Sequence, residues 1–211
     1  KRIGFSINRG HWVDVGGMAA GGWCGDARHV VQEALIIPPV KLYEGGVLNR
    51  EIKEFILKNI RMPDQCWGDI QAQIASNIVA ERRMRGLAAK YGLRAVMGAM
   101  EECLAYSKRR FAQALDRLPD GEYFGSEVQE DDGQGGGPYY IRVKVTKVGR
   151  RMKVDFTGTD PQVLGPVNGC FTETKAGTYT AIMAVVDPFI PMNSGLTDLI
   201  DVEAPVGCLV H

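Results

Sequence analysis

The sequence predicts an α+β fold, because two hydrophobic periods follow each other along the chain. Apolar residues recur at helical spacing between about residues 49 and 118. After Pro119 the pattern changes to strict alternation, clearest in residues 139–148, which is typical of a half-buried strand. Helices and strands that occupy separate stretches of a chain indicate an α+β fold and not an alternating α/β fold.

The first 48 residues are expected to form a β-rich and loop segment. Residues 2–8 alternate like a strand, and a glycine-rich loop follows through Gly25. Residues 30–43 are rich in Val, Ile and Leu but contain Pro38-Pro39, and proline is excluded from central strands. We therefore predict two extended stretches there, separated by the prolines.

Residues 49–118 form the second predicted segment, which is helical. Asn49 is a suitable N-cap for a short helix over 50–59, with an acidic residue in its first turn and Lys58 near its end. Two longer helices are predicted over 69–91 and 93–118, with Gly92 as the stop between them. Two helices joined by so short a turn are expected to pack as an antiparallel hairpin.

Residues 119–211 form the third segment, a β-meander with a further helix. Strands are predicted over 122–128, 139–148 and 152–156, and Lys147–Arg150 makes the turn between the last two. A helix is expected over 172–186. The chain begins directly on a strand-like run and stops on another, so we expect a fragment of a larger subunit.

Composition excludes several classes of function. The 211 residues carry 25 basic and 25 acidic side chains without long runs of one sign, so no nucleic-acid footprint is present. No apolar run is long enough to span a bilayer. The five cysteines are scattered, unlike a zinc ribbon or a disulfide framework, which favours reduced thiols and a cytoplasmic protein.

The candidate chemistry lies in the segment Gly10–Gly17. His11 stands three residues before Asp14, so imidazole and carboxylate can converge on one ion, or the carboxylate can orient the imidazole. On spacing alone, a structural histidine is the simpler interpretation. His29 follows Asp26 at the same spacing and is more simply a loop residue, and Cys24 is a nucleophile candidate without a recognisable activating signature.

Several short runs then occur in an order that resembles the hydantoinase B family. This family includes the C-terminal half of 5-oxoprolinase and the large subunits of acetone and acetophenone carboxylases. The runs cover nearly the whole chain and are residues 8–17, 37–43, 68–75, 118–121, 154–158, 165–168, 187–188 and 190–193.

The resemblance implies a divalent metal, zinc or manganese, with His11 as one ligand and Asp14 as a further metal ligand and candidate catalytic residue. Further ligands of the family are expected upstream of residue 1, so this chain alone should be inactive. The resemblance also implies a hetero-oligomer with a hydantoinase A-type subunit, which binds and uses ATP. Trp12 stands where the family often has a second histidine, as in the carboxylase-like branch.

The leading hypothesis is therefore part of the catalytic subunit of an ATP-coupled cyclic amidohydrolase that opens a hydantoin- or oxoproline-like ring. A ketone carboxylase large subunit is the enzymatic alternative. A non-catalytic assembly fragment, with the helices as a subunit interface, is the third. A metal in this setting acts as a Lewis acid or lowers the pKa of a bound water.

Overall fold

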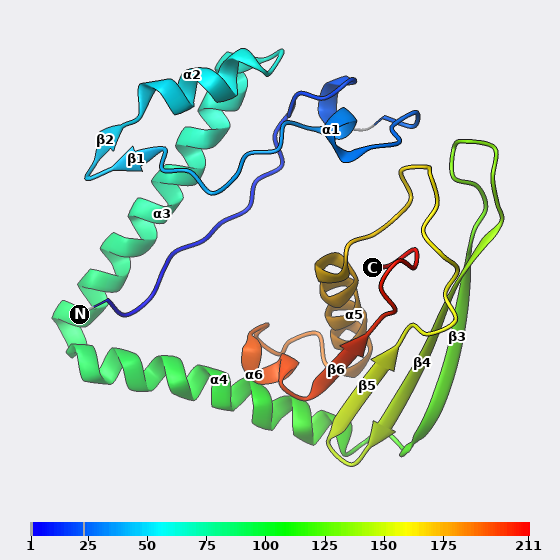
Figure 1. Ribbon diagram of the computed structural model, residues 1–211. Coiled ribbons are helices and arrows are strands. Elements are labelled where there is room, and N and C mark those ends of the chain that lie inside the picture. The colour runs from blue at the N-terminus through cyan, green and yellow to red at the C-terminus, as the bar shows by residue number, and fades with distance from the viewer. Residues whose placement is uncertain (1, 23) are drawn as a thin grey trace. The chain divides into compact units, whose positions relative to one another are not determined.

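The computed structural model describes residues 2–22 and 24–211, and the chain forms two compact units, residues 1–93 and 94–211 (Figure 1). The α+β class predicted from the sequence is confirmed. The boundary between the units falls after Leu93, where the long helix α3 (Pro63–Tyr91) has ended and the long helix α4 (Leu93–Leu115) begins. Because these helices belong mainly to different units, their packing as a hairpin stays a prediction, as does the division into three segments.

The first unit is built on helices α2 (Arg50–Lys58) and α3, with a small hairpin of β1 (Tyr43–Glu44) and β2 (Val47–Leu48) before them. A 3-10 turn, η1 (Ala20–Gly22), and a one-turn helix, α1 (Val30–Glu33), precede the hairpin. The core of the unit is small. Its buried members are Ile56, Ile60, Cys66 and Ile70, against which Trp12, Ile37 and Leu42 pack.

Two expectations for the first segment are wrong. Residues 2–8 contain no strand, and residues 30–33 are helical where an extended stretch was expected. The side chains of this N-terminal run form hydrogen bonds to helix α3 instead. The Ser6 hydroxyl donates to Asn77 Oδ1 at 2.7 Å, and the Asn8 amide donates to the backbone carbonyl of Gln73 at 2.7 Å. A strand requires a partner strand for its backbone groups, and within the described residues this run has none.

The helix starts follow the sequence rules. Asn49 Oδ1 accepts a hydrogen bond from the backbone N–H of Ile52 at 3.2 Å, as the N-cap prediction requires. Helix α3 begins six residues earlier than expected, at Pro63, because proline in the first turn needs no hydrogen-bond donor. It ends at Tyr91, where Gly92 takes a positive φ of 83°.

We expect Asn49→Ala to destabilise the first unit by about 1 kcal/mol, because the N–H of Ile52 loses its acceptor. The three tryptophans of the sequence all precede residue 94, and Trp12 and Trp67 pack against the core of this unit, so tryptophan fluorescence during urea unfolding measures its stability. Asn49→Asp keeps an acceptor at the cap and is the control, which should unfold like the parent. Equal losses in both variants would contradict the capping role.

The second unit contains a four-stranded sheet in the order β3-β4-β5-β6 (Figure 1). Its strands are β3 (Gly121–Gln129), β4 (Tyr139–Val148), β5 (Arg151–Asp155) and β6 (Ile200–Glu203). The first three are antiparallel, as the meander predicts, whereas β6 pairs parallel to β5. Helices α5 (Phe171–Val186) and α6 (Ser194–Thr197) lie in the connection between β5 and β6, because parallel neighbours require a crossover.

One face of this sheet is covered by helices. Phe111 and Leu115 of α4 are fully buried with Leu196, and residues of α5 pack against the same cluster. The cluster also contains Met152 and Val154 of β5 and Ile190, Leu199 and Ile200. The alternation along the strands places the remaining side chains on the other face.

The segment 187–196 is fixed to α4 by polar contacts. The Arg110 guanidinium donates to both Asp187 carboxylate oxygens, at 2.7 and 3.0 Å. Asn193 donates to the Ser107 hydroxyl at 2.8 Å, and that hydroxyl donates to the Pro191 carbonyl at 2.8 Å. These contacts give the sequence run from Asp187 to Asn193 a structural role.

None of the helices in the described residues combines the length and the apolar character that a membrane span requires.

Candidate functional site

The segment Gly10–Gly17 lies in the first unit and contacts the start of α3 and the turn before it. Trp12 donates its indole N–H to Gln73 Oε1 at 2.9 Å. Gly10 lies so close to Gln73 that an added Cβ would be 2.9 Å from its side-chain nitrogen. Gln73 therefore holds the residues on either side of His11.

Asp14 is fully buried, at 0% exposure, and its carboxylate is bound by Arg61. The backbone N–H of Arg61 donates to Oδ2 at 2.6 Å, and its guanidinium Nη1 donates to Oδ1 at 3.0 Å. The Cys66 thiol donates to the backbone carbonyl of Asp14 at 3.1 Å. These contacts anchor Asp14 to the turn between α2 and α3 and to the first turn of α3.

The surroundings of the Asp14 carboxyl group lower its pKa. Burial acts to raise its pKa, but the hydrogen bonds from the backbone and side chain of Arg61, with the guanidinium charge, outweigh burial and hold the pKa below its ordinary value. The N–H of Gly16 adds to the same effect. Asp14 is thus a buried carboxylate with a cationic partner.

Gly16 and Gly17 bring the segment close to two other backbones. Both have positive φ, 78° and 75°. A Cβ on Gly16 would lie 2.8 Å from the carbonyl oxygen of Asn59, and a Cβ on Gly17 would lie 2.4 Å from that of Glu33. The same two glycines expose their carbonyls to Arg61, which donates to Gly16 O at 3.3 Å and to Gly17 O at 2.5 Å. Only glycine allows this approach.

His11 lies between these two anchored stretches and is exposed. Within the described residues its imidazole has no hydrogen-bond or ion-pair partner. An exposed, unpartnered imidazole on a fixed segment is available to a metal ion or a substrate. The sequence alone does not indicate Arg61 or Gln73 as contributors to this site, although Gln73 lies in the run 68–75 that carries part of the resemblance.

The two alternatives raised by the sequence lie outside this arrangement. The His29 ring accepts the N–H of Val31 at 3.5 Å and caps helix α1, which is a structural role. Cys24 is half-buried and its thiol is free. No contact places it beside His11 or His29 in the described residues.

The described part of the chain does not by itself fit a closed metal site. No group of three or more His, Cys, Asp or Glu side chains in it is placed to hold a metal ion. His11 has a free imidazole, whereas both oxygens of Asp14 already accept hydrogen bonds. The assignment of His11 and Asp14 as metal ligands, and of Asp14 as catalytic, stays a prediction.

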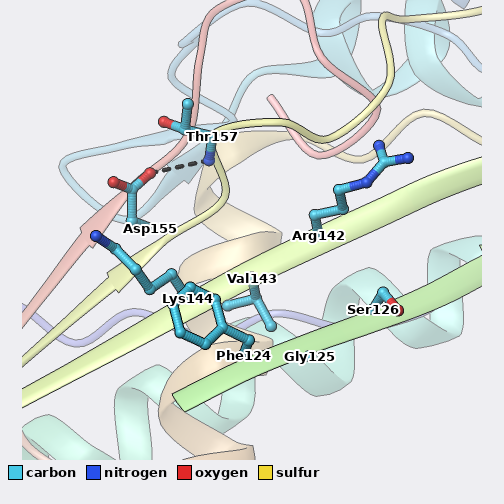
Figure 2. A pocket seen from close by; sticks show the side chains of 8 residues that line it. All are labelled: Phe124, Gly125, Ser126, Arg142, Val143, Lys144, Asp155 and Thr157. Carbon is cyan, nitrogen blue, oxygen red and sulfur yellow. Dashed lines mark hydrogen bonds between the residues drawn. The ribbon is translucent and has the colours of Figure 1, made fainter. Parts of the chain in front are cut away.

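A second candidate is an open hollow of about 630 Å³ on the sheet of the second unit (Figure 2). Cross-strand neighbours Phe124, Lys144 and Asp155 form a row across it, with Lys144 extending toward Asp155. The remaining lining residues are Gly125, Ser126, Arg142, Val143 and Thr157.

The cations of this hollow are already paired. Lys144 lies 3.3 Å from Glu122, and Arg142 lies 3.0 Å from Asp160. The side chain and N–H of Thr157 bind Asp155 and lower the pKa of its carboxyl. With neither an unpaired charge nor a His or Cys among its lining residues, the hollow offers less chemistry than the His11 segment.

Comparison with known proteins connects both units to one family. The family model described as Hydantoinase B/oxoprolinase matches residues 1–211. The putative B-type subunit of a D-/L-hydantoinase from Pseudomonas sp. strain NS671 is 35% identical over 99% of this chain and 37% of its own length. The crystal structure of ATP-dependent caprolactamase from Pseudomonas jessenii superposes with a TM-score of 0.87 at 30% identity, over 93% of this chain and 34% of that chain.

A more distant likeness concerns the fold alone. A nucleotide-free acetone carboxylase structure matches with a TM-score of 0.84 at 14% identity, over 95% of this chain and 28% of that chain. The chain spans little more than a third of the length of its curated relatives, 36% and 37% of the first two. Because the family model covers every residue and the ordered runs lie in both units, the chain belongs to the hydantoinase B/oxoprolinase family.

Proposed function

We propose that this chain is part of the catalytic subunit of an ATP-dependent enzyme that opens a cyclic amide ring of the hydantoin, oxoproline or lactam type. The observation that carries the proposal is the His11 segment, which presents an unpartnered imidazole between two anchored stretches. Two relatives are named for enzymes that act on cyclic amides, a hydantoinase and a caprolactamase. They are 35% and 31% identical to this chain over nearly its whole length. The acetone carboxylase likeness, at 14% identity, supports only the fold.

The proposed contribution of this chain to a divalent-metal site is the His11 imidazole. Further ligands would come from parts of the full-length protein outside this chain, since the described residues supply no complete set. A bound zinc or manganese ion supplies Lewis-acid chemistry at a carbonyl or phosphoryl oxygen. Asp14 lies in the same segment and has a lowered pKa. Its sequence-based assignment as a second ligand or catalytic residue is tested separately by the variants described below.

The proposed partner is an A-type subunit that binds ATP and activates the substrate. Support comes from the names of two relatives, each of which is one subunit of a larger enzyme: the B-type subunit of a hydantoinase and the beta-type subunit of caprolactamase. A cytoplasmic location is proposed because all five cysteines of this chain are free thiols, as is usual in reducing compartments.

The test is His11→Ala in the intact complex of both subunits. We expect the metal content to fall and the rate of ATP-dependent ring opening to drop by more than about 100-fold. This is a larger loss than the removal of a residue that only hydrogen-bonds to a metal ligand would cause. His29→Ala is the matched control, because His29 only caps α1 and should retain both metal and turnover. The measurements are metal analysis and hydrolysis of hydantoin, 5-oxoproline and caprolactam with ATP.

Two results would contradict the proposal. Full metal content and turnover in His11→Ala would remove His11 from the site. Consumption of a ketone with labelled bicarbonate, without hydrolysis of any cyclic amide, would make the complex a carboxylase.

A further inference from the structure

We infer that Asp14 is not a metal ligand but the buried anchor of the His11 segment, and that Arg61 and Gln73 are the positioning residues that present His11. The inference rests on the proposed function in one respect, that His11 is the group presented. It differs from the sequence-based expectation, in which Asp14 binds the metal or reacts itself.

The Asp14 carboxylate is closed to solvent, whereas His11 is open to it. The Asp14 side chain is 0% exposed, whereas the Arg61 side chain above it is 44% exposed. Its two oxygens accept the backbone N–H of Arg61 at 2.6 Å and the guanidinium at 3.0 Å. To bind this carboxylate, a metal ion would have to enter a site that is closed to solvent, next to a guanidinium that already makes a charge-assisted hydrogen bond there. His11 is exposed and has no such competitor in the described structure.

The side chain of Arg61 binds three parts of the segment at once. The Arg61 guanidinium reaches the Asp14 carboxylate and the carbonyls of both Gly16 and Gly17. A planar guanidinium with five N–H donors suits such a combined contact, and lysine does not. Arg61 follows α2 and precedes α3, so it links the segment to the helical frame of the unit.

The segment is held by hydrogen bonds on both sides of His11. On the N-terminal side, Asn8 donates to the Gln73 carbonyl at 2.7 Å and to Ser76 Oγ at 2.7 Å. Directly after His11, the Trp12 indole binds Gln73 Oε1 at 2.9 Å. Arg61 holds the following turn. Two fixed ends leave His11 little freedom to move, which is the arrangement that a preorganised ligand requires.

Anchoring and ligation predict different orders of metal affinity. If Asp14 is the anchor, Arg61→Met should lower the metal affinity more than any other change at this pair, because it leaves a buried carboxylate without its cation. Asp14→Asn is milder, because Asn keeps an acceptor for the N–H of residue 61 and the half-exposed guanidinium stays hydrated. The double variant Asp14→Asn/Arg61→Met contains neither charge, so its metal affinity should return toward that of the parent. If Asp14 is instead a metal ligand, Asp14→Asn and the double variant should lose metal affinity to the same extent.

The experiment measures the Mn²⁺ and Zn²⁺ affinity of the full-length protein in competition with a chelator, for the parent and the variants. We expect Arg61→Met to bind about 10–100-fold more weakly, as loss of an outer-shell partner does, and Gln73→Ala to weaken binding in the same direction. The double variant should bind within about threefold of the parent. Arg85→Met removes an exposed pair with Glu81 and is the control, which should change nothing.

His11→Ala separates failure of this inference from failure of the proposed function. Loss of metal in both His11→Ala and the folded double variant would make Asp14 a ligand and overturn the inference. Retention of metal in His11→Ala would overturn the proposed metal role instead. Tryptophan-monitored unfolding then still decides the anchor: a lower midpoint in Arg61→Met than in the double variant supports it, and equal midpoints overturn it.

Discussion

Replacing Gly17 by Ala is expected to destabilise the first unit by about 3 kcal/mol. The residue has a positive φ of 75°, which costs a non-glycine residue about 1 kcal/mol or more. In addition, the new Cβ would lie 2.4 Å from Glu33 O and 2.6 Å from Gln32 O, both backbone atoms. Steric overlap of this kind costs about 1–3 kcal/mol because the backbones must separate.

Gly45→Ala is the matched control for this prediction. Gly45 also has a positive φ, 58°, but an added Cβ there meets no atom within 4 Å. Gly45→Ala should therefore lower the stability of the first unit only by the cost of the positive φ, about 1 kcal/mol. Urea unfolding followed by tryptophan fluorescence measures both variants. Equal losses would show that the backbones of residues 17 and 33 do not approach as described.

The Gly17 prediction also bears on function. The N–H of Met18 donates to Gln32 O at 2.6 Å, and that of Leu35 donates to Val15 O at 2.8 Å. Separating these backbones would release the turn that follows Asp14. We expect Gly17→Ala to weaken metal binding in the full-length protein, whereas Gly45→Ala should leave it unchanged.

Replacing Phe111 by Ala is expected to destabilise the second unit by about 3–5 kcal/mol. Phe111 is fully buried in the cluster between α4 and the sheet, and its loss leaves a cavity as well as removing apolar contacts. Because none of the tryptophans lies in residues 94–211, the effect is measured by hydrogen exchange of peptides from β4 and β5.

Phe124→Ala is the control for the same residue type in the same unit. Phe124 on β3 is 76% exposed, and its truncation should change stability by no more than about 0.5 kcal/mol. Comparable acceleration of exchange in both variants would contradict the assignment of the core to the α4 side of the sheet.

The sequence alone was sufficient for elements whose information is local. The N-cap at Asn49, the stop at Gly92 and the alternation over residues 139–148 all appear in the structure where they were predicted. The family also follows from the sequence, because the ordered runs extend through both units. Residues 2–8 show the limit of local patterns, since alternation makes a strand only where a partner strand is present.

The surroundings of the candidate site were decided by tertiary contacts. Spacing treats His11 and Asp14 as a pair, but the fold exposes His11 and buries Asp14 against Arg61, 47 residues away in the sequence. Gln73 is 61 residues from Trp12. Whether a carboxylate faces a metal or a guanidinium depends on which distant residue the fold brings beside it. That choice is fixed by packing and burial, and no local pattern in the sequence records it.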